Sequence, residues 1–106
     1  HGTATPANDA AEGKAVMALF GDQVACSSIK GATGHTLGAA GAVEAVICAL
    51  AMTNDLLPGS PNTTTRDPAI PLNYQLTSRS GKVRYALSNS FGFGGSNCSL
   101  ILGVAQ

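Results

Sequence analysis

One segment of 18 residues, from 36 to 53, constrains the fold of this chain more than any other. Glu44 is its one charged residue, and alanine and larger apolar residues fill most of the other positions. A helix that is apolar on every side is buried on every side, so we expect a helix wrapped by other parts of a soluble protein. Gly38, Gly41 and Glu44, together with the many alanines, make the segment poorly hydrophobic for a membrane span. The rest of a 106-residue chain can hardly surround such a helix, so the sequence predicts a fragment of a larger protein.

Charged residues are scarce throughout the chain. They make up 11% of it, with six basic and six acidic residues and a formal net charge of zero, whereas about 25% is typical of soluble domains. A nucleic-acid or anionic-membrane partner would need a basic stripe, so we expect neither partner. A small free-standing domain needs a charged surface. This composition therefore also favours burial of the chain against more protein.

The cysteines indicate a reducing compartment. Cys26, Cys48 and Cys98 are odd in number and have no disulfide or metal-type spacing, which favours free thiols in the cytoplasm and predicts no metal cluster. None of them has a histidine in its sequence neighbourhood that would mark it as an activated nucleophile. We therefore expect none of the three to be catalytic.

Local signals predict a helix, a strand and a loop in the first two thirds of the chain. Asp9 and Glu12 match a capping box, which predicts a helix over residues 10–20. A short run at residues 24–29 predicts a strand. Residues 56–72 hold four of the five prolines, which predicts a long surface loop.

A β-hairpin is predicted near the C-terminal end. Residues 82–90 and 97–104 are strand-like, and the glycine-rich residues 91–96 would join them. Phe93 lies between two glycines in this turn. Such glycines provide either a hinge that swings the ring as a gate or a tight turn that needs positive φ, and the residues alone leave both interpretations open.

The two histidines of the chain both lie in segments rich in glycine and threonine. His1 begins the run His-Gly-Thr-Ala-Thr-Pro, and His35 ends the run Lys-Gly-Ala-Thr-Gly-His that starts at Lys30. His35 stands at the amino end of the predicted apolar helix, where the helix dipole disfavours a positive charge on the imidazole. A neutral imidazole can donate its N–H to a developing oxyanion. His1 and His35 are therefore candidate catalytic residues.

Lys30 and Glu44 form a second candidate group. A buried carboxylate such as that of Glu44 needs a partner, and Lys30, which lies shortly before the same helix, can provide it. The pair would hold the turn that carries His35 in place. The alternative is an ordinary exposed lysine and a glutamate that faces a solvent-filled groove.

Together these motifs resemble the C-terminal part of the β-ketoacyl-acyl-carrier-protein synthases, which are condensing enzymes of the thiolase-like fold. The blocks His-Gly-Thr-x-Thr-Pro, Lys-x-x-x-Gly-His and Asn-Ser-Phe-Gly-Phe-Gly-Gly occur here in the order of that family. The elongating enzymes of type II fatty-acid synthesis are the most similar, followed by modular polyketide synthase domains. The resemblance implies an α/β fold with a layered α/β/α architecture, of which residues 1–106 would form the C-terminal part.

By this resemblance, His1, His35 and Lys30 would be catalytic in a decarboxylative Claisen condensation. The two histidines would donate hydrogen bonds to the malonyl thioester carbonyl, and Glu44 would support Lys30. The other implied site residues are Thr3 and Thr5 at the phosphopantetheine arm, Phe93 as the gate of the acyl pocket with Phe91 beside it, and Glu44, Ser88 and Asn89 around an optional monovalent cation.

The resemblance also implies the partners of the chain. Substrates would arrive on the phosphopantetheine of acyl carrier protein, so we expect no cofactor, and the intact enzyme would be a homodimer. The nucleophilic cysteine of the family belongs to an earlier segment, and none of the three cysteines here matches its motif. We therefore expect a missing N-terminal half and no acyl transfer by this chain alone.

Two alternatives stay open. A non-catalytic subunit resembling chain-length factors would keep the fold, although the intact His1, Lys30 and His35 favour the enzyme. A free-standing binding module would unfold cooperatively as residues 1–106 alone, whereas we expect the isolated segment to aggregate because of its apolar helix.

Overall fold

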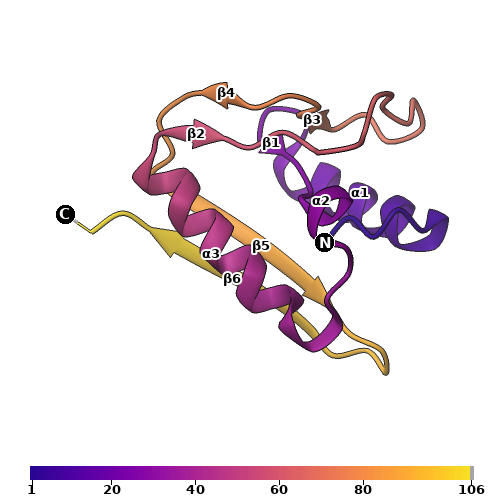
Figure 1. Ribbon diagram of the computed structural model, residues 1–106. Coiled ribbons are helices and arrows are strands. Elements are labelled where there is room, and N and C mark those ends of the chain that lie inside the picture. Colours follow the sequence, from indigo (N-terminus) through magenta and orange to yellow (C-terminus); the bar gives the residue numbers. More distant parts are fainter. Residues whose placement is uncertain (106) are drawn as a thin grey trace. The chain divides into compact units, whose positions relative to one another are not determined.

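The computed structural model describes residues 1–105, and the chain forms two compact units. The histidine unit contains His1, residues 35–57 and the chain from Arg79 onward, and the loop unit contains residues 2–34 and 58–78. In chain order the elements are α1 (Pro6–Phe20), β1 (Ala25–Cys26), α2 (Lys30–Thr33), the 3₁₀ helix η1 (Leu37–Ala39), α3 (Ala40–Thr53), β2 (Leu56–Leu57), β3 (Asn73–Tyr74), β4 (Arg79–Ser80), β5 (Tyr85–Phe91) and β6 (Asn97–Gly103) (Figure 1).

The histidine unit consists of a helix packed on a hairpin. β5 and β6 pair antiparallel, from Tyr85 opposite Gly103 to Phe91 opposite Asn97. α3 lies along this hairpin and contacts both of its strands (Figure 1). A short antiparallel pair, β2 with β4, completes the unit. The predicted hairpin is confirmed, although its first strand begins at Tyr85 rather than at residue 82.

The apolar helix is confirmed, and the described residues leave one side of it exposed, as expected if further protein surrounds it; its burial on every side stays a prediction. η1 forms its first turn and α3 the remainder. Ala40 and Ala51 are buried, whereas Val46 is 59% exposed and Leu50 is 52% exposed, because the hairpin covers one side of the helix. No helix within residues 1–105 combines the length and the hydropathy that a membrane crossing requires.

The hairpin also has an apolar face that points away from α3. Ser90 faces α3, since a Cβ added to Gly41 of that helix would lie 3.3 Å from Ser90 Oγ. Strand side chains alternate between the two faces, so Tyr85 and Leu87 lie on the opposite face. Ile101 pairs with Leu87 and shares this face. The three side chains are 72%, 39% and 65% exposed, respectively.

The loop unit contains α1, α2 and one parallel strand pair. In this pair, Ala25 of β1 lies opposite Asn73 of β3, and Cys26 lies opposite Tyr74. The strand predicted at residues 24–29 is thus present but only two residues long. Its partner strand was not predicted, because parallel strands are joined by long connections that leave no local turn signal.

α1 begins four residues before its predicted start, and the predicted capping box is wrong. Pro6 occupies the first turn after an extended Thr5, where its fixed φ and missing N–H suit a helix start. The N–H of Asp9 donates to the carbonyl of Thr5 (3.0 Å), so Asp9 lies inside the helix. Glu12 instead accepts a hydrogen bond from the backbone N–H of Gly2 (3.0 Å).

The proline-rich segment is a surface loop only in its middle part. Residues 61–69 are largely exposed, as predicted. Ser60, however, is 1% exposed, and its hydroxyl accepts a hydrogen bond from the N–H of Ser28 (3.2 Å). The N–H of Gly59 donates to Ser78 Oγ (2.8 Å). The start of this segment is therefore part of the interior of the loop unit.

Candidate active site

The structure brings both histidines together with one aromatic residue. The ring centroids of His1 and His35 are 5.2 Å apart with an interplanar angle of 88°. The ring of Phe91 also contacts His1, with centroids 5.4 Å apart and an interplanar angle of 69°. All three residues belong to the histidine unit. The chain thus gathers side chains from its beginning, from the start of the α3 segment and from the end of β5.

A backbone hydrogen bond orients the His35 ring. The N–H of Leu37 donates to Nδ1 of His35 (3.2 Å), so Nδ1 carries no proton and a neutral imidazole carries it on Nε2. Leu37 has φ +54°, an unfavourable backbone conformation for a leucine. His35 thereby presents an Nε2–H donor, which is the group that the stabilisation of an oxyanion requires.

The residue after His1 is fixed within the loop unit. The N–H of Gly2 donates to Glu12 Oε2 (3.0 Å), and its carbonyl accepts from Ser28 Oγ (3.1 Å). Gly2 has φ +54°, and a Cβ there would lie 2.5 Å from Ser28 Cβ. Only glycine fits this position, because any side chain would meet Ser28 in a backbone conformation that L-residues avoid.

Three further predicted site residues lie in the loop unit. The hydroxyls of Thr3 and Thr5 are 2.8 Å apart and share a hydrogen bond. Lys30 begins the one-turn helix α2 and is buried, at 8% exposure. A buried lysine contradicts the alternative of an ordinary exposed side chain. Its pairing with Glu44, which belongs to the other unit, stays a prediction.

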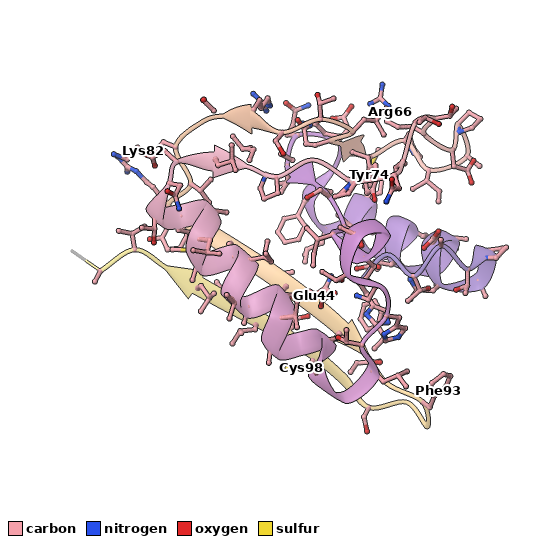
Figure 2. All side chains as sticks on the ribbon, in the orientation of Figure 1. Glu44, Arg66, Tyr74, Lys82, Phe93 and Cys98 are labelled. Carbon is pink, nitrogen blue, oxygen red and sulfur yellow. The ribbon has the colours of Figure 1, made fainter. Side chains whose placement is uncertain are left out.

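Glu44 lies on α3 of the histidine unit (Figure 2). Its Oε2 is buried, which agrees with the predicted burial of this carboxylate, and the alternative of a solvent-filled groove beside it stays open. Ser88 and Asn89 are successive residues of β5, so their side chains point to opposite faces of the hairpin. Asn89 Oδ1 accepts a hydrogen bond from Ser99 Oγ (2.7 Å). A monovalent cation at Glu44 could therefore use the side chain of only one of these two strand residues, and this site stays a prediction.

The two phenylalanines of the glycine-rich block have different environments. Phe91 ends β5 against His1, whereas Phe93 is 95% exposed at the tip of the hairpin (Figure 2). Gly94 and Gly95 have φ of +85° and +87°, and the N–H of Gly92 donates to the carbonyl of Ser96 (2.7 Å). The glycines therefore serve the tight-turn interpretation, and the role of Phe93 as a gate stays a prediction.

Two of the three cysteines are poor nucleophiles. Burial, followed by the charge of Glu12, raises the pKa of the Cys26 thiol above its usual value. Burial, followed by the charge of Glu44, raises the pKa of Cys48. Both effects disfavour the reactive thiolate. All three cysteines are free, as predicted.

Sequence reasoning missed the groups that fix His35 and Gly2. The N–H of Leu37 carries no side-chain signal, and Ser28 and Ser60 are unremarkable serines until the fold brings them together. Glu12 was noticed, but its spacing from Asp9 was assigned to a local cap. The glycine after His1 was the one usable signal, since it marks a backbone under tight steric limits.

Comparisons with known proteins show the family of the chain. Residues 1–64 match the family described as Beta-ketoacyl synthase, C-terminal domain. The chain is 45% identical to the mitochondrial 3-oxoacyl-[acyl-carrier-protein] synthase of Arabidopsis thaliana and 46% identical to 3-oxoacyl-[acyl-carrier-protein] synthase 2 of Vibrio harveyi. In both cases 95% of the chain is aligned. The aligned part is 23% of the length of the Arabidopsis protein and 26% of the length of the Vibrio protein. The chain belongs to the β-ketoacyl synthase family, and it spans about a quarter of the length of these relatives.

Solved structures show the same fold. A β-ketoacyl synthase from Burkholderia phymatum STM815 matches the whole chain with a TM-score of 0.93 and 41% identity over 26% of its own chain. The ishigamide ketosynthase/chain length factor matches with a TM-score of 0.94 and 36% identity over 27% of its chain. The predicted α/β thiolase-like fold class is therefore confirmed.

Proposed function

We propose that the chain is the C-terminal part of a 3-oxoacyl-acyl-carrier-protein synthase and provides the decarboxylation half of its active site. The observation that carries the proposal is the pair of imidazoles at 5.2 Å, one of which has its Nδ1 blocked by a backbone N–H. Family membership and the names of the relatives give the reaction class, an acyl transfer that involves acyl carrier protein.

The geometry suits enolate stabilisation. His1 and His35 would donate hydrogen bonds to the carbonyl oxygen of a malonyl thioester. As the carbon–carbon bond to the malonyl carboxylate breaks, CO2 leaves. The electron pair of that bond stays on the thioester as an enolate, whose oxygen these donors stabilise. The enolate carbon then attacks the acyl thioester carbonyl, and the thiolate that carried the acyl group leaves. That thiol would come from the rest of the protein, since Cys26 and Cys48 are disfavoured as thiolates.

The remaining predicted residues would assist the two histidines. Buried Lys30 would orient the site with the support of Glu44, and Thr3 and Thr5 would bind the phosphopantetheine arm. Phe91 would hold the His1 ring and Phe93 would gate the acyl pocket. We further propose that the intact protein contains an N-terminal half with the nucleophile, forms a homodimer and acts in the cytoplasm, where its free thiols would stay reduced.

A second candidate is a non-catalytic partner subunit. It is favoured by one observation, the match to the ishigamide ketosynthase/chain length factor. Such a subunit would retain the fold while releasing no CO2 from malonyl-carrier protein. The intact histidine pair favours the enzyme instead.

The test is malonyl decarboxylation by the full-length protein with two matched variants of His35. In H35N, the amide oxygen next to Cγ still accepts the Leu37 N–H, but no donor reaches the position of Nε2. In H35Q, the longer amide reaches that position and can donate there. We expect H35N to lose about 10²- to 10³-fold in rate and H35Q to retain clearly more.

The control is acylation of the nucleophilic cysteine, which both variants should retain. A decarboxylation rate of H35N within about threefold of wild type, against the ~10²-fold typical of a lost oxyanion donor, would contradict the proposed role of His35. A wild-type protein that releases no CO2 at all would support the partner subunit.

A further inference from the structure

The helix α3 follows His35, and the strand β5 ends at Phe91. These two elements approach each other closely at Gly41. A Cβ at this position would lie 3.3 Å from Ser90 Oγ, so Ser90 would have to move by a few tenths of an ångström. Ser90 directly precedes Phe91, whose ring contacts His1. A shift of the strand at Ser90, in contrast to a rotation of its hydroxyl, would therefore also move Phe91, which touches His1.

Gly41 is also close to His35 along the chain. η1 and α3 form one continuous helical segment that begins two residues after His35, and Gly41 lies in the first turn of α3. The N–H of Leu37 at the start of this segment is the donor that orients His35. Gly41 and Ser90 thus lie where the helix that carries this donor meets the strand that carries Phe91.

Helix formation gives no reason for glycine here. Glycine is among the poorest helix formers, and alanine is the best. Gly38 provides a contrast within the same segment, because a Cβ there would meet no atom of residues 1–105 within 4 Å. The two glycines differ in packing, and only Gly41 is needed for a close approach.

We propose that Gly41 is a positioning residue for the histidine pair: the missing side chain lets α3 pack on Ser90 at the distance that brings His35 and Phe91 against His1. The proposal rests on the proposed function, because its readout is the decarboxylation that His1 and His35 would support. Gly41 itself touches no substrate in this mechanism.

The test compares G41A, the double variant G41A/S90A, the single variant S90A and the control G38A in the full-length protein. A misplacement of about 1 Å in a catalytic site can cost about 100-fold, so we expect G41A to lower kcat of malonyl decarboxylation by about three- to tenfold, with little change in KM. S90A removes the one atom that the new Cβ would meet and should restore most of the loss. The melting temperature of G41A should stay the same or rise, because alanine favours the helix.

Each outcome separates the inference from the proposed function. Recovery of kcat in the double variant, with normal activity of G38A, would support the positioning role. Wild-type kcat in G41A, no recovery in the double variant, or an equal loss in G38A would overturn it. H35N is measured in the same assay: if H35N also keeps full activity, the proposed function is wrong, whereas a defective H35N with a normal G41A rejects the positioning role alone.

Discussion

Replacing Gly59 by alanine should destabilise the loop unit severely. A Cβ at Gly59 would lie 2.5 Å from the carbonyl carbon of Thr77, 2.6 Å from the nitrogen of Ser78 and 2.7 Å from Thr77 Cα. All three are backbone atoms and cannot rotate away. The shortest of these distances is roughly 1 Å less than an ordinary contact between carbon atoms, so one of the two backbone segments must move.

The cost follows from what that movement would break. The N–H of Gly59 donates to Ser78 Oγ (2.8 Å), and the N–H of the buried Ser60 donates to the carbonyl of Leu76 (3.2 Å). Losing a hydrogen bond in a buried place costs about 1 kcal/mol or more, and overpacking adds about 1–3 kcal/mol. We therefore expect G59A to lower the free energy of unfolding by about 3–5 kcal/mol.

Urea unfolding of the full-length protein measures this loss, with G21A as the matched control. Gly21 follows α1 with φ +66° and ψ −150°, a conformation almost confined to glycine, and a Cβ there would meet no atom of the described residues within 4 Å, so G21A should cost only the backbone strain of about 1–3 kcal/mol. If G59A loses less than about 1 kcal/mol, or no more than G21A, the steric reasoning is wrong.

Two other predictions concern side chains of the histidine unit. Because burial and Glu44 raise the pKa of Cys48, iodoacetamide should alkylate it in the native protein more slowly than free glutathione at pH 8, and the rate should rise only above the usual thiol pKa of about 8.5. The raised pKa of Cys48 stabilises the fold below the unfolded-state pKa, and this contribution is lost as the pH rises through the folded-state pKa. Alkylation of Cys48 as fast as that of glutathione would refute the raised pKa and, with it, this pH dependence of stability. F91L should lower malonyl decarboxylation severalfold, because the Phe91 ring contacts His1, whereas F93A should alter the distribution of acyl products and leave decarboxylation unchanged. The opposite pattern, measured by CO2 release and product chain length, would reject these two roles.

Local patterns predicted the local structure well. The β5–β6 hairpin was predictable because strand-like runs and a glycine-rich turn lie next to each other in the sequence. The start of α1 was mispredicted because two start signals compete there, and Pro6 at the first turn prevails over the capping-box spacing of Asp9 and Glu12. Where two local signals for a helix start are equally plausible, the rest of the fold decides which of them the helix uses.

Structure that depends on distant partners was not predictable. β1 finds its partner at Asn73, and Ser60 is buried against Ser28, although neither pairing has a signal in the chain. The meeting of His1 with His35 likewise followed only from the resemblance to a family. In a chain of this length, residue spacing predicts helices and hairpins, whereas parallel pairing and side-chain clusters need the tertiary fold.

The ring contacts of His1 also have a consequence for folding. They join the first described residue to His35 and to Phe91 near the other end of the chain. The entropy of closing so long a loop must be overcome before these contacts contribute anything, and such distant contacts form slowly. A folding intermediate with native α3 and a native hairpin would still lack the histidine pair. Under the proposed function, CO2 release would then require closure of these contacts, which helical content measured by circular dichroism would not detect.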